Sequence, residues 1–120
     1  MKIYTYSKCG TCRRAVKWLR ENNVEFDERP IRETPPTRTE LRRMLAEHGG
    51  EIRKLFNTSG VDYREQKLSE KLPTLTETAA LELLATNGNL VKRPFLIGEE
   101  AAIVGFNPDR WAGRLGISTK

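Results

Sequence analysis

The sequence predicts an α/β domain with a four-stranded mixed sheet and a helical insertion in its middle. Three observations predict this class: a strand–helix–strand pattern near the start, a series of helical patterns across the centre, and a hairpin followed by a closing helix. With 120 residues, of which 38% are hydrophobic and 31% charged, the chain fits one globular domain covering 1–120.

The first part of the chain predicts two parallel strands joined by a helix. Residues 2–6 (KIYTY) are rich in aromatic and β-branched side chains, which is typical of a strand. Apolar residues then recur at helical spacing from Thr11, and we expect the helix to end near 21–23, where asparagine tolerates a left-handed conformation. Residues 24–31 (VEFDERPI) alternate as in a strand, and Pro30 places the end of that strand at an edge or terminus.

The middle of the chain predicts a helical insertion at about 34–88. A helix within 33–50 begins at Thr37 or Thr39, and Glu40 stands three residues after Thr37, as a capping box requires. A pair of glycines ends this helix. Three further segments predict a short helix, a short helix with a loop, and a longer helix: 51–60, 63–75 and 76–89.

The C-terminal part predicts a hairpin and a helix. Residues 90–98 and 99–106 form two apolar runs with a short turn, which favours antiparallel pairing. Asn107 is placed to cap a last helix over 107–116, with Pro108 at its first position, and the last four residues are expected to fray. This order of elements is that of a thioredoxin-like fold with a helical block inserted in its middle.

The composition indicates the compartment and excludes some partners. No apolar run approaches the roughly 18 residues of a membrane span, and the N-terminus lacks a signal-peptide cleavage site, so we expect a cytoplasmic protein without a membrane partner. The net charge is +5, but acidic residues interrupt the basic ones and aromatic residues do not interleave with them. We therefore expect no direct nucleic-acid binding. The simpler explanation of the net charge is a solvated basic surface. The more specific alternative is an acidic partner or an anionic substrate.

The only two cysteines, Cys9 and Cys12, form a CxxC motif at the first turn of the first predicted helix. A helix N-terminus presents unpaired N–H groups and a partial positive charge, which favour a thiolate over a thiol. In a cytoplasmic protein such a pair is more often redox-active or metal-bound than a structural disulfide. We predict Cys9 as the attacking thiol and Cys12 as the resolving thiol, with backbone N–H groups of Gly10 and Thr11 near the sulfur.

Two alternatives for the cysteine pair are weaker. A structural zinc site needs four ligands, and His48 is the one further soft candidate in the sequence, so no metal and no cofactor is predicted. His48 precedes a glycine pair and is better explained as a helix-end residue. Two unreactive buried cysteines are the other alternative, although Cys9 follows a lysine and precedes a glycine in a predicted turn, which is a poor place for burial.

Arg93 and Pro94 form the second candidate region. A proline can open a strand where no ladder donor is needed. In thioredoxin-like folds a cis-proline at this point faces the CxxC motif and leaves neighbouring backbone groups free for a substrate chain. Arg93 would then lie near Cys9, where its guanidinium can hold an oxyanion or support a thiolate. The alternative is an ordinary surface arginine.

Four motifs in this order resemble the arsenate reductase-like superfamily: YSKCGTCRRAVKWL, ETPPTRTEL, KLFNTSGVDYRE and NGNLVKRPFLI…VGF. That superfamily includes the glutaredoxin-coupled arsenate reductases and the Spx-type redox regulators. The resemblance implies a thioredoxin-like fold and a thiol–disulfide redox protein that uses a Cys9–Cys12 disulfide. It also implies a thiol reductant as partner, either glutathione with glutaredoxin or the thioredoxin system.

The chain departs from the true arsenate reductases. Those proteins carry a CGTSR-type motif, in which the catalytic cysteine matches Cys9 and the serine is replaced here by Cys12. Of the three arginines that they place around the oxyanion, one matches Arg93. The other two fall at Asn57 and near Phe106, where this chain has no arginine. An arsenate dianion beside a thiolate needs concentrated positive charge, which argues against arsenate turnover.

The CGTC and NTSG motifs look more like the Spx-type branch. In that branch a CxxC switch tunes binding to the α subunit of RNA polymerase, and the helical insertion, where Asn57 falls, makes partner contacts. The leading expectation is a thiol–disulfide redox protein, and the alternatives are an Spx-like transcription regulator that binds RNA polymerase and a glutaredoxin-coupled arsenate reductase. The sequence leaves open whether the chain is an enzyme or a regulator. Gly10, Thr11, Asn57 and Pro94 are the expected substrate contacts.

Overall fold

The computed structural model describes residues 1–117, and its elements follow the predicted order. The strands are β1 (Lys2–Thr5), β2 (Asp27–Pro30), β3 (Phe95–Ile97) and β4 (Ala102–Val104). The α-helices are α1 (Gly10–Glu21), α2 (Arg38–Glu47), α3 (Val61–Glu65), α4 (Leu68–Lys71), α5 (Glu77–Thr86) and α6 (Pro108–Leu115). Short 3₁₀ helices are η1 (Ile52–Leu55), η2 (Leu72–Thr74) and η3 (Gly88–Leu90). Residues 118–120, which the sequence predicts to fray, lie outside the described part.

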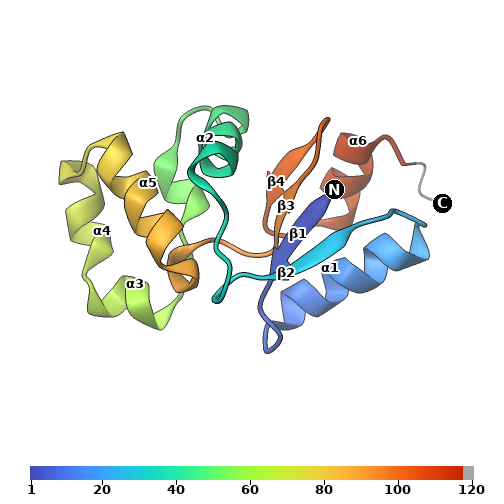
Figure 1. Ribbon diagram of the computed structural model, residues 1–120, viewed down its shortest axis with the longest axis horizontal. Helices are drawn as coiled ribbons and strands as arrows, with labels where there is room; N and C mark the ends of the chain where they lie inside the picture. Colours follow the sequence, from blue (N-terminus) through green and yellow to red (C-terminus); the bar gives the residue numbers. More distant parts are fainter. Residues whose placement is uncertain (118–120) are drawn as a thin grey trace.

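The four strands form one mixed sheet in the order β2-β1-β3-β4. Strand β1 pairs parallel with β2 and antiparallel with β3, and β3 pairs antiparallel with β4. In Figure 1, helices α2 to α5 gather on one side of the sheet, while α1 and α6 lie on the other. The predicted thioredoxin-like class, with a mixed sheet and a helical insertion between β2 and β3, is confirmed.

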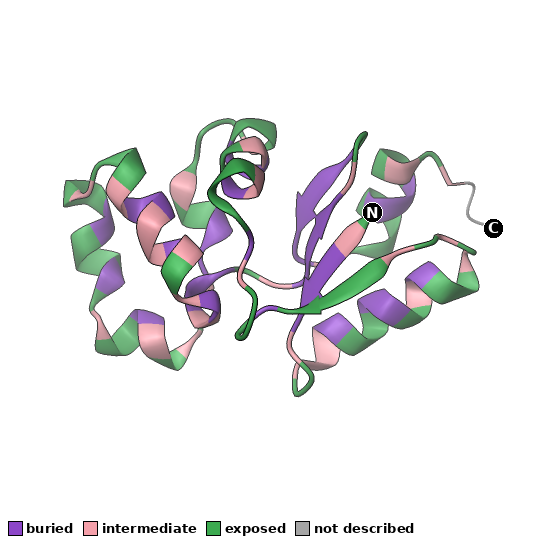
Figure 2. Cartoon of the chain, in the orientation of Figure 1, coloured by how far each residue is buried: buried purple, intermediate pink, exposed green. Residues whose placement is uncertain are grey.

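The alternation of side chains along the strands divides the interior into two cores. Ile3, Leu96 and Ile103 point to one face and pack with apolar residues of α1 and α6. Tyr4 and Phe95, one residue away on the same strands, point to the other face and pack with the insertion. Figure 2 shows β1, β3 and β4 as largely buried strands, whereas β2 is exposed along its length. The sheet is therefore covered by helices on both faces but open at its β2 edge.

Helix ends occur where the predicted capping residues stand. The Thr37 hydroxyl accepts the N–H of Glu40, and the Glu40 carboxylate accepts the N–H of Thr37, which completes the capping box of α2. Helix α1 ends before Asn23, which adopts a left-handed conformation with φ 56°. Asn107 caps α6 through the N–H of Arg110. Within residues 1–117, no helix is long and apolar enough to cross a bilayer.

The predicted strand over 90–98 is wrong in its first half. Val91 forms only an isolated bridge with Phe56, and the N–H of Lys92 donates to the carbonyl of Leu55 in η1. Only the last part, β3, joins the sheet. The segment before β3 is therefore held by the insertion instead of by β1, and this long-range pairing leaves no periodic signal in the sequence.

Other boundaries are also shorter than predicted. Of the predicted strand over 24–31, only β2 (Asp27–Pro30) forms. The helix predicted over 76–89 ends at Thr86, the last residue of α5. After α5 the chain turns because the Asn87 side chain accepts the N–H of Asn89. Gly88 lies so close to the backbone just after β2 that a Cβ there would stand 1.8 Å from the carbonyl oxygen of Ile31, so a side chain is excluded.

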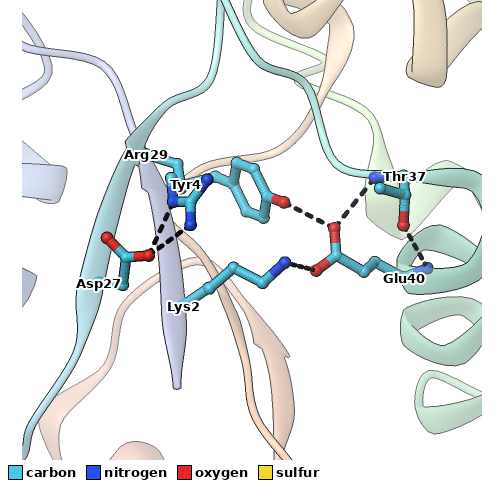
Figure 3. A network of polar contacts seen from close by, with 6 residues as sticks. All are labelled: Lys2, Tyr4, Asp27, Arg29, Thr37 and Glu40. Carbon is cyan, nitrogen blue, oxygen red and sulfur yellow. Dashed lines mark hydrogen bonds and ion pairs between the residues drawn. The ribbon is translucent and has the colours of Figure 1, made fainter.

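One polar network ties the insertion to the centre of the sheet (Figure 3). The carboxylate of Glu40, near the start of α2, accepts the Tyr4 hydroxyl at 2.6 Å and pairs with Lys2 Nζ at 2.7 Å. Burial raises the pKa of Glu40, but the contacts with Lys2, Tyr4 and the N–H of Thr37 outweigh it and hold the pKa below its usual value. The ion pair of Asp27 and Arg29, also drawn in Figure 3, lies exposed on β2 and is expected to contribute little.

We expect the substitution Glu40→Gln to lower the free energy of unfolding by about 1–2 kcal/mol at neutral pH. The folded-state pKa of Glu40 lies below the ordinary value of 4.5, so its contribution is complete above that value and is lost as the pH falls through the folded-state pKa. The difference between the native chain and the variant should therefore shrink in acid. Urea unfolding at about pH 7 and about pH 3 measures both differences.

The exposed Glu65, in the last turn of α3, provides the matched control. Glu65→Gln removes the same charge and should leave the stability nearly unchanged at both pH values. A Glu40→Gln variant that is destabilised equally at neutral and acid pH would contradict the assigned role of the ionised carboxylate.

Candidate functional site

Cys9 is the N-cap residue of α1, reached from β1 through a tight turn. The turn is closed by the N–H of Cys9, which donates to the carbonyl of Tyr6 at 3.0 Å. The Cys9 sulfur accepts the N–H of Cys12 at 3.4 Å, so it occupies the place where a serine or aspartate side chain usually caps a helix. The half-buried sulfur therefore lies against the unpaired N–H groups of the first turn of α1.

Cys12 lies one turn further along α1 and is only 1% exposed. Residues three apart in a helix lie on the same face, so the two thiols are neighbours. Both cysteines are present as free thiols. The described residues hold no group of three or more His, Cys, Asp or Glu side chains arranged to bind a metal ion.

The two thiols differ in acidity because they differ in environment. Partial burial raises the pKa of Cys9, but hydrogen bonds from the Cys12 backbone and thiol, the charge of Arg93 and the N–H of Thr11 together bring that pKa below its ordinary value. The pKa of Cys12 is raised to about 12, chiefly by its deeper burial and also by the hydrogen bond and the negative charge of Cys9. The N–H of Tyr6 and the charge of Arg93 act in the opposite direction. The pair thus favours a thiolate at Cys9 and a thiol at Cys12.

The register of the sheet brings Arg93 to this site. Phe95 in β3 stands opposite Tyr4 in β1, so the antiparallel strands carry Arg93 toward Tyr6, just before the cysteine turn. The Arg93 guanidinium lies 5.0 Å from the centre of the Tyr6 ring. Its Nη1 is buried and has no hydrogen-bond acceptor among residues 1–117. The peptide bond between Arg93 and Pro94 is cis, as the thioredoxin-like plan predicts.

Tyr6 and Arg32 belong to the site but were not found by sequence reasoning. The Arg32 guanidinium lies 5.1 Å from the Tyr6 ring centre, and its Nη1 donates to the Tyr6 hydroxyl at 3.1 Å. Tyr6 thus contacts two guanidinium groups, those of Arg32 and Arg93. The strand register and the position of Tyr6 just before the cysteine turn were the available signals for Tyr6. No local signal marks Arg32, which follows β2.

The remaining predicted site residues lie in different surroundings. Gly10 opens α1 directly after Cys9. Asn57 lies where the insertion meets the segment before β3: its N–H donates to the carbonyl of Leu90 at 2.7 Å. None of the hydrogen bonds among residues 1–117 joins Asn57 to either cysteine, so its role as a substrate contact stays a prediction. Phe106 stacks edge-on against Trp111, in the apolar core beneath α1 and α6.

A groove of about 310 Å³ lies beside α1, next to the cysteine turn. It is lined by Tyr6 and Cys12, and it continues along α1 past Arg13, Lys17 and Arg20. These three basic residues recur at helical spacing and face the same groove. Glu28 also lines the groove, so its charge is mixed, and Cys12 is the one cysteine among its lining residues.

The fold and this site define a thioredoxin-like domain that presents a CxxC thiol pair at the start of its first helix. The sequence model of the ArsC family matches residues 4–113, so the chain belongs to the ArsC family.

Individual relatives agree with this membership. The chain is 46% identical to the YusI protein of Bacillus subtilis over 111 residues, which are 92% of this chain and 94% of that protein. It is 34% identical over 109 residues to the global transcriptional regulator Spx of Enterococcus faecalis, covering 91% of this chain and 81% of the regulator. Among solved structures, an ArsC family related protein from Bacteroides fragilis is 48% identical and superposes with a TM-score of 0.87 over 94% of this chain and 95% of that one.

We expect the substitution Arg93→Gln to raise the pKa of Cys9, because the guanidinium is one of the charges that stabilise its thiolate. The rate of alkylation by iodoacetamide as a function of pH measures this value, since only the thiolate reacts. Cys12 should stay unreactive in the folded protein because it is buried.

Arg20→Gln is the matched control, since Arg20 stands in the last turn of α1, away from the cysteine turn. It removes the same charge and should leave the alkylation profile of Cys9 unchanged. Equal effects of the two substitutions would mean that Cys9 senses only the net charge of the protein.

Proposed function

We propose that the protein is a cytoplasmic thiol–disulfide redox protein in which Cys9 attacks and Cys12 resolves. The geometry carries this proposal: the Cys9 sulfur caps α1 and accepts the N–H of Cys12, whose own thiol is buried one turn away. The opposite shifts of the two thiol pKa values support it. A lowered pKa favours a nucleophilic thiolate at the half-buried Cys9 sulfur, while a raised pKa keeps the buried Cys12 protonated until it is needed.

In the first step, the Cys9 thiolate attacks one sulfur of a substrate disulfide. A mixed disulfide between Cys9 and the substrate forms, and the other substrate sulfur leaves as a thiolate that takes a proton from water. Cys12 then loses its proton and attacks the Cys9 sulfur, which forms the Cys9–Cys12 disulfide and releases the second substrate thiol. The substrate disulfide gains two electrons, and the cysteine pair loses them.

The environment of Cys12 changes between these steps in the direction that the mechanism needs. Two of the causes that raise its pKa are the hydrogen bond and the negative charge of Cys9. Both are lost when Cys9 becomes part of a neutral mixed disulfide. The pKa of Cys12 then falls, and its thiolate becomes available for the resolving attack.

The other predicted residues act on the same sulfur or on the substrate. Arg93 steadies the thiolate, and the N–H groups of the first turn, including that of Thr11, donate toward it. Pro94 shapes the surface beside the cysteines where a substrate chain docks, and Gly10 leaves the backbone open beside the sulfur. A thiol reductant, either glutathione with glutaredoxin or a thioredoxin, then reduces the Cys9–Cys12 disulfide: two of its thiol groups become a disulfide, and both cysteines return to thiols.

A Cys12→Ser variant should accumulate a mixed disulfide on Cys9, because the resolving thiol is missing. We propose incubation with oxidised glutathione and mass spectrometry of the intact protein, which should gain one glutathione. The native chain should instead end as the internal Cys9–Cys12 disulfide, two hydrogen atoms lighter than the reduced form.

The Cys9→Ser variant is the control for this experiment. It should form no adduct under the same conditions, because the remaining thiol at position 12 is buried and has a raised pKa. An adduct that forms on Cys12 in this variant would reverse the roles of the two cysteines. Absence of both the adduct and the internal disulfide would contradict the redox function itself.

The second candidate function is redox-dependent regulation of transcription. It is favoured by the likeness to the global transcriptional regulator Spx, which extends over 91% of this chain. Here the Cys9–Cys12 disulfide would change the affinity of the insertion and its surroundings for the RNA polymerase α subunit.

A pull-down with purified components tests this candidate. The chain is immobilised in its oxidised or its reduced form, and the RNA polymerase that each form retains is measured. Retention in only one redox state is expected for a regulator. Equal binding in both states, or no binding, leaves the thiol–disulfide reaction as the function that the site supports. The Cys12→Ser variant, which cannot form the internal disulfide, should lose any difference between the two states.

Arsenate reduction receives less support from the geometry. Of the three positions that match the arginines of the arsenate reductases, only Arg93 carries a guanidinium, while Asn57 is an amide and Phe106 lies in an aromatic cluster. A coupled assay with arsenate, glutathione, glutaredoxin and NADPH should therefore show no arsenate-dependent NADPH oxidation.

A further inference from the structure

A second cavity, of about 550 Å³, lies between the helical insertion, the edge strand β4 and the start of α6. Neither cysteine lines it. Its charged lining residues come from three separate segments of the chain: Glu51, Arg53 and Lys54 near η1, Lys92 before β3, and Arg110 in α6. Although the basic residues are scattered along the sequence, the fold gathers four of them around one cavity.

The positive charge of this cavity is not neutralised by the protein. Lys54 forms an ion pair with Glu51, the one carboxylate in the lining, at 3.4 Å. Arg53, Lys92 and Arg110 form no ion pair with any carboxylate among residues 1–117. Three basic residues therefore line the same cavity without an ion-pair partner among residues 1–117.

Backbone contacts fix the positions from which these groups reach the cavity. The N–H of Lys92 donates to the carbonyl of Leu55 at 2.8 Å, so the segment before β3 is held directly against η1, which carries Arg53. The Arg110 guanidinium donates to the carbonyl of Val104 at 2.8 Å. Carbonyl acceptors orient a guanidinium without cancelling its charge, and the remaining N–H groups stay available.

The rest of the lining suits an organic molecule. Phe56 and Val104 are buried and contribute apolar surface to the cavity, and Thr58 contributes a hydroxyl group. His48, at the end of α2, also lines the cavity, and its ring Nδ1 lies 2.8 Å from the carbonyl oxygen of Met44. The volume falls within the roughly 300–1,000 Å³ that small-molecule sites span.

We propose that this cleft binds a small organic anion that carries two or more phosphate or carboxylate groups. Several cations around one cavity match an anion that carries more than one charge, whereas a singly charged ion would leave at least one cation unpaired. Guanidinium groups bind phosphate and carboxylate through paired hydrogen bonds, and the apolar lining contacts the carbon skeleton between the charged groups. This site is separate from the thiol site and does not rest on the proposed redox function.

The test is a titration of the reduced full-length chain with pyrophosphate and, separately, with citrate, followed by ¹H–¹⁵N NMR. Saturable shifts are expected at the amides of Arg53, Lys92 and Arg110. The double variant Arg53→Ala/Lys92→Ala should raise the dissociation constant about tenfold or more, because each lost cation removes charge-assisted hydrogen bonds. Comparing the two anions distinguishes a phosphate site from a carboxylate site.

The double variant Arg64→Ala/Lys71→Ala is the control, since it removes the same charge from exposed positions that do not line the cavity. It should bind both anions as tightly as the native chain. The proposal is overturned by shifts that spread over the basic surface without saturation, or by an equal loss of affinity in the control. Binding of a polyglutamate peptide without binding of either small anion would also overturn it and indicate a docking surface for an acidic protein.

Circular dichroism establishes whether the variants fold. If the Arg53→Ala/Lys92→Ala variant does not fold, Lys92→Gln alone keeps the test decisive, because the Lys92 side chain is exposed and its backbone contact is retained. This single variant should bind both anions measurably more weakly than the native chain, and unchanged affinity would count against the proposal.

Discussion

Strand β1 has hydrogen-bonded neighbours on both of its edges, and the other parts of the molecule are positioned by this double pairing. Its two faces belong to different cores, because Ile3 packs under α1 and α6 while Tyr4 packs under the insertion. Its side chains also hold α2 through Glu40. Its C-terminal end leads into the turn that places Cys9 at the start of α1, and its register with β3 carries Arg93 to Tyr6. One short strand therefore sets the packing and the chemistry together.

The parts of the fold that the sequence predicted are those whose signals are local. The capping box of Thr37 and Glu40 lies within four successive residues, and the same is true of the Asn107 cap of α6, so helix starts could be located. The first half of the predicted strand over 90–98 failed for the opposite reason. Its long-range hydrogen bonds join Lys92 to Leu55 and Leu90 to Asn57, more than thirty positions away, and no periodic pattern in the sequence predicts such a pairing.

The candidate site divides in the same way. The spacing of Cys9 and Cys12 and the helix that follows them are local features, so their juxtaposition at a helix N-terminus could be anticipated from the sequence. The unequal pKa values of the two thiols depend on burial and on Arg93, which arrives from the other end of the chain. The contact of Arg32 with Tyr6, and the gathering of Arg53, Lys92 and Arg110 around one cavity, arise only when distant segments fold together.

The exposed edge of the sheet has a consequence for the behaviour of the protein in concentrated solution. An unpaired strand edge offers free N–H and carbonyl groups to any other chain that can align beside it. In β2 this edge is only four residues long, three of them are charged, and Pro30 contributes no N–H donor. Edge-to-edge pairing between copies of the chain is consequently unfavourable at β2. The protein is protected against self-association and fibril formation at this edge without a covering helix.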